Sequence, residues 1–171
     1  MKKQITKTPT ITPDPSNPNR LDRAETLRPR LCVMGSRTLE DERVKIILLE
    51  EINKTNCAAI ITCAEPGGVS EVARKLAKEK GMPLILFHLN FKYLRGAFEH
   101  RSIDALRASD AAVFVHDGES KGTANELQVC KKIGVPYRYE KLEKSPHKES
   151  VGFPVADGEW AAIMQKALDD A

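Results

Sequence analysis

The sequence has no CxxC spacing, no apolar run of membrane-spanning length and no export signal at its start. Its cysteines lie singly in apolar segments, a pattern that predicts buried free thiols at Cys32, Cys57, Cys63 and Cys130. Free thiols fit a reducing compartment. The start at Met1 lacks the apolar stretch of a signal peptide. These absences predict a cytoplasmic protein that makes no contact with a membrane.

The sequence also lacks the two familiar phosphate-binding fingerprints, GxGxxG and GxxxxGK[ST]. It has no strong excess of either charge, because the formal net charge is only +3. Residues 1–30 carry +4 of net charge, which leaves −1 for the rest of the chain. Residues 31–171 are therefore not a basic platform, and nucleic acid is an unlikely partner for them.

The composition divides the chain into three parts. Residues 1–28 hold four prolines and few large apolar side chains, which predicts a disordered tail. A basic arm that touches nucleic acid or a protein partner is the alternative for this tail. Residues 29–142 form the expected nucleotide-ligand-binding domain. Residues 143–171 form a linker and a helix with an apolar stripe that either packs on the sheet or forms a homodimer: Trp160, Ile163, Met164, Ala167 and Leu168.

Short apolar segments alternate with helical patterns between residues 31 and 139. The expected strands are 31–34, 58–63, 83–87, 111–115 and 135–139. This alternation predicts an α/β fold, a Rossmann-like doubly wound five-stranded parallel sheet of order 3-2-1-4-5, with a C-terminal amphipathic helix. Ligands bind such sheets at the carboxyl ends of the strands, where the strand order reverses. The long connection 88–98 is expected to be a lid or binding loop.

The stretch AAVFVHDGESKGTANEL, residues 111–127, is the central feature of the chain. It predicts a buried strand, a turn with glycines, and a helix that opens at Thr123. The start of a helix attracts anions, because its first N–H groups have no partner in the helix. We therefore expect a phosphate site here. The plainer alternative is that Thr123-x-x-Glu126 is only a capping box and Asp117-Gly118 only a turn.

Three turns that contain glycine follow three of the predicted strands and would converge on one crevice. Together they predict a site for a phosphate-bearing small molecule, with no metal and no cofactor. The candidate ligand-binding residues are Gly35, Ser36, Arg37, Gly67, Gly68, Asp117, Gly118, Ser120, Gly122 and Thr123. Three histidines fall near strand–helix junctions, but nothing in their spacing enforces a metal site: His88, His100 and His116.

The order of these motifs resembles the SLOG superfamily over about residues 31–140. This Rossmann-like group joins the DprA DNA-processing proteins to the LOG phosphoribohydrolases, and the branch related to YspA and YpsA is the most similar. The resemblance rests on a first strand ending in Gly35-Ser36-Arg37, a second ending near Gly67-Gly68, the helix start His100-Arg101-Ser102, and Asp117-Gly118-x-Ser120-x-Gly122-Thr123 after a later strand.

LOG enzymes hydrolyse the N-glycosidic bond of nucleoside monophosphates with a PGGxGTxxE motif and an upstream arginine. Gly122-Thr123-Ala124-Asn125-Glu126 matches the second half of this motif, whereas Gly118-Glu119-Ser120-Lys121 replaces its first half. The resemblance implies Glu126 and Arg101 as catalytic residues. Plainer interpretations are a capping box for Glu126, an exposed helix position for Arg101, and a pair of Arg37 with Asp41 or Glu42.

Three functions remain open on the sequence. The first is a sensor or carrier that binds a nucleotide or nucleotide-derived phosphate ligand. The second is a nucleoside 5′-monophosphate phosphoribohydrolase. The third is a DprA-like module that binds single-stranded nucleic acid through the tail and the aromatic and basic residues of segment 91–95.

Overall fold

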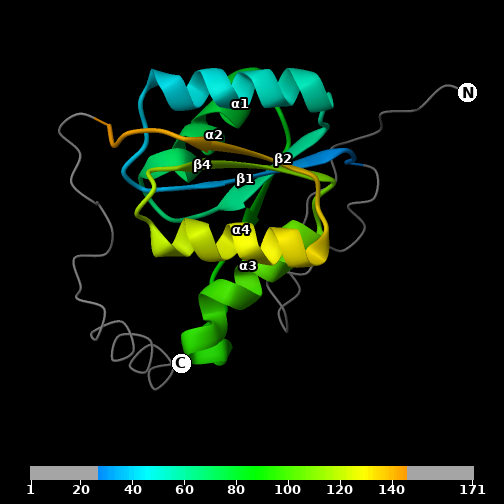
Figure 1. Cartoon of the computed structure of the whole chain (residues 1–171). Helices are drawn as coiled ribbons and strands as arrows, with labels where there is room; N and C mark the ends of the chain where they lie inside the picture. The colour runs from blue at the N-terminus through cyan, green and yellow to red at the C-terminus, as the bar shows by residue number, and fades with distance from the viewer. Residues whose placement is uncertain (1–26, 146–171) are drawn as a thin grey trace, which may run out of the picture.

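The computed structural model describes residues 27–145 (Figure 1). The expected disordered tail, apart from its last two residues, and the expected C-terminal helix lie outside this range. Within the described range, none of the helices combines the length and the apolar character that a bilayer span needs.

A five-stranded sheet forms the centre of the molecule, in the order β3-β2-β1-β4-β5, and all four pairs of neighbours are parallel. This confirms the predicted fold class and strand order. It also places β1 beside β4, so the order reverses between the loops after these two strands. The strands are β1 Arg30–Gly35, β2 Ala59–Cys63, β3 Leu84–Phe87, β4 Ala111–His116 and β5 Tyr137–Lys141.

Helices cover both faces of the sheet, as Figure 1 shows. The helices are α1 Glu42–Thr55, α2 Gly68–Lys80, α3 Ala97–Arg107 and α4 Lys121–Ile133. Alternate residues of a strand point to opposite faces, and each face packs a separate core. Leu31 and Val33 of β1 pack with α1 and α2, whereas Cys32 and Met34 pack with α3 and α4. Both faces are apolar because helices cover both.

The start of α4 differs from the sequence-based expectation, whereas α1 begins at an acidic N-cap. The N-cap of α1 is Asp41, and its carboxylate accepts a hydrogen bond from the Arg43 backbone N–H. The N-cap of α4 is Ser120. Thr123 is therefore already inside α4, and the capping box of Thr123 with Glu126 does not form. The physical reason is that Asp117 accepts from the Ser120 N–H and fixes Ser120 at the start of α4, where its hydroxyl accepts from the Thr123 N–H at 3.5 Å.

The connection between β3 and α3 is partly ordered as a 3-10 segment, η2 Phe91–Gly96. It lies over the start of α3, where the Tyr93 ring stacks on the His100 ring with the centroids 3.8 Å apart. Leu94 has a φ of 47°, which is rare for a residue other than glycine. The expected lid is thus anchored to α3 at one end.

Candidate functional site

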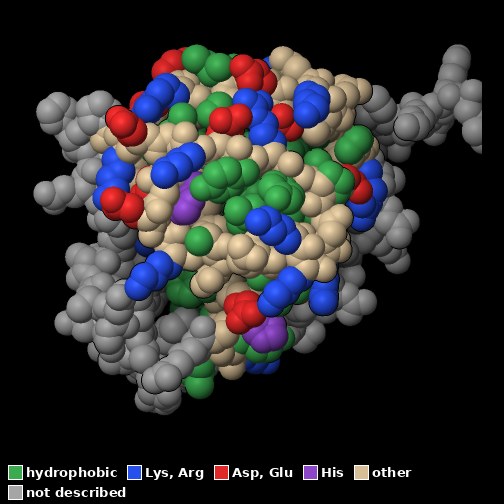
Figure 2. All heavy atoms as spheres, in the orientation of Figure 1, with side chains coloured by type: hydrophobic (Ala, Val, Ile, Leu, Met, Phe, Trp, Pro, Cys, Tyr) green, Lys and Arg blue, Asp and Glu red, His purple; other side chains and the backbone are tan. Residues whose placement is uncertain are grey.

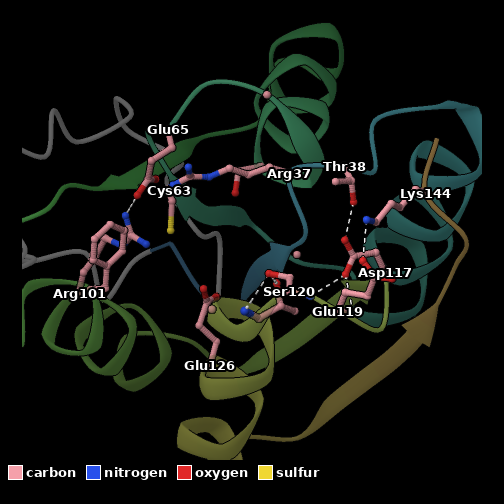
Figure 3. A pocket seen from close by; sticks show the side chains of 16 residues that line it. Arg37, Thr38, Cys63, Glu65, Arg101, Asp117, Glu119, Ser120, Glu126 and Lys144 are labelled. Carbon is pink, nitrogen blue, oxygen red and sulfur yellow. Dashed lines mark hydrogen bonds and ion pairs between the residues drawn. The ribbon is translucent and has the colours of Figure 1, made fainter. Parts of the chain in front are cut away.

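A cavity of about 400 Å³ opens at the carboxyl ends of β1, β2 and β4 (Figure 3). It lies at the reversal of the strand order, where the sequence predicts a ligand site. Its lining carries several charged side chains of both signs. The lining residues are Gly35, Arg37, Thr38, Cys63, Glu65, Gly67, Ser70, Phe98, Arg101, Asp117, Glu119, Ser120, Gly122, Thr123, Glu126 and Lys144.

Nine of the twelve predicted site residues line this cavity: Gly35, Arg37, Gly67, Arg101, Asp117, Ser120, Gly122, Thr123 and Glu126. The other three hold the loops in place. Ser36 is buried, and its hydroxyl accepts from the Asp117 N–H at 3.0 Å. Gly68 and Gly118 both have positive φ. A Cβ on Gly68 would stand 2.4 Å from the Arg37 Cα, so only glycine lets these two loops approach.

The start of α4 faces the cavity. Ser120, Gly122 and Thr123 belong to its N-cap and first turn, and all three line the cavity. The positive end of the helix dipole is therefore directed at the enclosed space. This turn contains no acidic residue. It can bind an anionic group such as a phosphate through backbone N–H groups and two hydroxyls.

Asp117 organises the loop before α4. Its Oδ1 accepts from the backbone N–H groups of Glu119 and Ser120, both at 2.8 Å, and its Oδ2 accepts from the Thr38 hydroxyl at 2.6 Å. Burial alone would raise the pKa of Asp117, but these bonds outweigh it and lower the pKa to about 2. Asp117 thus joins the loop after β1 to the loop after β4.

The start of α2 is occupied by the protein's own carboxylate. The Gly68 N–H donates to Glu40 Oε2 at 3.0 Å, and the Val69 N–H donates to the Ser36 carbonyl at 3.2 Å. Glu40 therefore stands where an anionic ligand would bind. Of the three glycine turns, the one before α2 is closed by internal contacts.

Arg101 and Glu65 form a buried ion pair at the opposite end of the cavity from Lys144 (Figure 3). The side chains are 5% and 13% exposed, which overturns the interpretation of Arg101 as a surface residue. Arg101 Nε and Glu65 Oε2 have no hydrogen-bond partner within the described residues. Buried polar atoms without partners are costly. This pair therefore retains one donor and one acceptor for a further group.

Glu126 projects from α4 between the two ends of the cavity (Figure 3). Burial raises its pKa to about 7, although the positive charges of Arg101 and Arg37 act in the opposite direction. Glu126 is consequently near half-protonation at neutral pH and can give or take a proton. Burial, followed by the charge of Arg101, lowers the pKa of Arg37. Both effects mark the cavity as a site of perturbed titration.

His116 takes a structural role. His116 is buried, with Nδ1 2.7 Å from the Tyr139 hydroxyl and Nε2 2.9 Å from the Ser120 carbonyl. It connects β4, β5 and the start of α4. Over residues 27–145 no cluster of His, Cys, Asp and Glu side chains could hold a metal ion.

Sequence reasoning missed several lining residues. Glu65 carries a weak signal, since an acidic residue directly after a strand reaches the ligand edge of a parallel sheet. Thr38 is not among the predicted site residues, and Cys63 is expected only as a buried thiol. Nothing in the sequence indicates that Lys144 lines the cavity. It lies in the segment expected to be a linker, which returns to the site because the Ser145 N–H donates to the Thr38 carbonyl.

No family model matches this chain, and no curated protein matches it. Among solved structures, the crystal structure of an isoflavone reductase is similar, with a TM-score of 0.40 and 11% sequence identity. The match covers 83% of this chain and 46% of that chain, so this chain spans less than half of the reductase. Similarity at this level carries no argument about activity. The sheet order itself defines a Rossmann-like α/β fold, which is compatible with nucleotide binding.

Proposed function

We propose that this protein binds a nucleotide or nucleotide-derived phosphate ligand in the cavity between β1, β2 and β4. The observation that carries the proposal is the open start of α4, which faces a cavity of about 400 Å³. Pockets of a few hundred Å³ suit ligands of the size of a nucleotide. The proposal includes membership of the SLOG superfamily, which the order of the glycine turns supports.

The ligand phosphate would lie at the first turn of α4. Its oxygens would accept hydrogen bonds from backbone N–H groups and from the hydroxyls of Ser120 and Thr123. Arg37 lines the same cavity and adds a positive charge. The sugar and base would extend along Glu126 toward Arg101, which lies farther from Lys144 in Figure 3.

Titration calorimetry tests this proposal with nucleoside monophosphates, ribose 5-phosphate and inorganic phosphate. We expect a nucleotide to bind, and Arg37→Ala to weaken binding at least about tenfold, since a hydrogen bond to a charged group contributes about 1.5–3 kcal/mol. Arg107→Ala is the matched control, because Arg107 is exposed on α3 and does not line the cavity. If no nucleotide binds, or if both variants weaken binding equally, the proposal is wrong.

A second candidate function is favoured by the pKa of Glu126. A carboxyl group that titrates near pH 7 suits a general base. In a nucleoside 5′-monophosphate phosphoribohydrolase, Glu126 would take a proton from a water molecule as that water attacks the anomeric carbon. The N-glycosidic bond would break, with release of the free base, protonated as it leaves, and ribose 5-phosphate. Arg101 would stabilise negative charge on the ligand.

Chromatography of nucleoside monophosphates incubated with the protein separates the two functions. Release of free base that is lost in Glu126→Gln, with nucleotide binding retained, supports the hydrolase. Binding of the intact nucleotide without any free base supports the sensor or carrier and excludes the hydrolase for that nucleotide.

A further inference from the structure

Strand β5 is an edge of the sheet whose outer side is open among the described residues. Over residues 27–145 it pairs only with β4. Tyr137 and Tyr139 are 43% and 38% exposed, which is high for large side chains of a strand. Figure 2 shows hydrophobic side chains gathered in the middle of the molecular surface that is in view. This patch lies between α1 and α4, where β5 runs in Figure 1. An exposed edge of this kind is a template for another strand.

The hydrogen bonds to β4 determine which backbone groups of β5 point outward. The Ala112 N–H donates to the Pro136 carbonyl, and the Leu142 N–H donates to the His116 carbonyl. The backbone N–H and C=O groups of the even-numbered residues of β5 thus point toward β4. In a parallel strand the N–H and C=O of one residue point to the same side and alternate along the strand. Within the described part of the chain, the backbone groups without a partner are therefore those of Tyr137, Tyr139 and Lys141.

When β5 pairs antiparallel with a second β5, only one register both forms the backbone hydrogen bonds and places opposite charges against each other. The outward residues of the two strands must face one another to exchange hydrogen bonds. If Tyr139 faces Tyr139 of the second copy, Tyr137 faces Lys141, and Arg138 faces Glu140 in both directions. A shift by two residues in either direction would instead place Arg138 against Arg138 or Glu140 against Glu140, which is destabilising.

We propose that β5 pairs antiparallel with β5 of a second copy of this chain about a two-fold axis at Tyr139. The two sheets would join into one continuous sheet of ten strands. The self-complementary order of Arg138 and Glu140 carries this inference, together with the exposed tyrosines. The symmetry is that of a two-fold dimer, in which the same patch serves both subunits.

The surroundings of Arg138 allow this contact. On one face, Arg138 is held by Glu50 and Glu51 of α1 and by Glu140, at 2.9–3.3 Å. Two of these acidic partners remain when Glu140 turns to the second copy. On the other face, the exposed rings of Tyr137 and Tyr139 would lie across the dimer axis, with Lys141 of the opposite strand against Tyr137.

Analytical ultracentrifugation of the full chain over a range of concentrations is the first test. We expect a reversible dimer of the wild type, and a dissociation constant raised at least about tenfold in Glu140→Arg, which makes both cross-strand pairs repulsive. Glu99→Arg is the matched control, because Glu99 is exposed on α3 and should leave the dimer unchanged. Circular dichroism confirms that each variant is folded.

Mixing two variants provides a test that misfolding cannot imitate. Arg138→Glu and Glu140→Arg should each be poor at self-association. In an equimolar mixture every cross-strand pair is again opposite in charge, so a heterodimer should form. A mixture that stays monomeric would overturn the proposed register.

Hydrogen exchange resolves what covers the edge. In the dimer, the Tyr139 amide should be protected in the wild type and lose that protection in Glu140→Arg. A wild type that is monomeric at every concentration overturns the proposal. In that case a protected Tyr139 amide would show that another segment of the same chain covers β5. A dimer that Glu140→Arg leaves intact also overturns the proposal.

Discussion

The starts of α2 and α4 look alike in the sequence and differ in the structure. Each follows a turn with glycines at the carboxyl end of a parallel strand. At α2, the Gly68 N–H donates to Glu40, so an internal carboxylate takes the place of a ligand. At α4, one acidic residue of the loop, Asp117, accepts from the N–H groups of Glu119 and Ser120, and the first turn of the helix remains open to the cavity. Equivalent turns therefore give one structural site and one candidate binding site.

Replacing a glycine with alanine at each helix start should reveal the largest difference in stability between α2 and α4. Gly68→Ala should cost about 3 kcal/mol or more in the free energy of unfolding, because φ is +70° and the new Cβ would meet the backbone of Arg37. Gly122→Ala should be neutral or stabilising by up to about 1 kcal/mol, since nothing lies within 4 Å of its Cβ position. Urea denaturation of both variants measures the difference, and equal losses would contradict this comparison.

The pH dependence of stability should sharpen the comparison at α4. The folded-state pKa of Glu126, about 7, lies above its ordinary value of 4.5. The unfolded chain therefore loses this proton first, and the folded state loses stability as the pH rises from about 4.5 to 7. Glu126→Gln cannot ionise, so its stability relative to the wild type should increase across this range by on the order of 2 kcal/mol. Thermal denaturation at pH 5 and pH 8 measures this, and a constant difference would contradict it.

Removing the internal carboxylate at α2 should make the two helix starts more alike. Glu40→Ala should cost about 1 kcal/mol, because the Gly68 N–H loses a charged acceptor at the positive end of the helix. Sulfate should recover part of this loss by binding at the vacated position. The measurement is the melting temperature with and without sulfate. Glu71→Ala, in the first turn of the same helix but without this bond to Gly68, is the control.

The smallest effect is expected at the mouth of the cavity near α4. Glu119 and Lys144 form an ion pair at 2.6 Å, with side chains 71% and 46% exposed. Exposed pairs contribute little to stability. Glu119→Gln should change the free energy of unfolding by less than about 0.5 kcal/mol. A larger loss in the free energy of unfolding, measured by chemical denaturation, would contradict this expectation.

The sequence is sufficient for the fold because its signals are local. Four apolar segments, a more polar fifth and the helices between them set the layers, and right-handed crossovers leave few sheet orders. The cavity is partly predictable for the same reason, since residues after parallel strands gather at one edge. Arg101, Glu126 and the glycine turns do meet there.

The remaining features depend on contacts between distant parts of the chain. Glu40 could not be assigned to the start of α2 from the sequence, because 28 residues separate it from Gly68. Glu65 gains its importance only from the ion pair with Arg101. Ser120 displaced Thr123 as the N-cap because the bonds of Asp117 fix the loop before it. In each case side-chain geometry, and not periodicity, decides.

The bonds of Asp117 also bear on the kinetics of binding. They tie Ser36 and Thr38, after β1, to the loop that leads into α4 before any ligand arrives. A ligand phosphate would then meet donors that need no rearrangement. Association should be governed by diffusion and orientation, in one phase whose rate rises linearly with ligand concentration. Differences in affinity among ligands should accordingly arise from their dissociation rate constants.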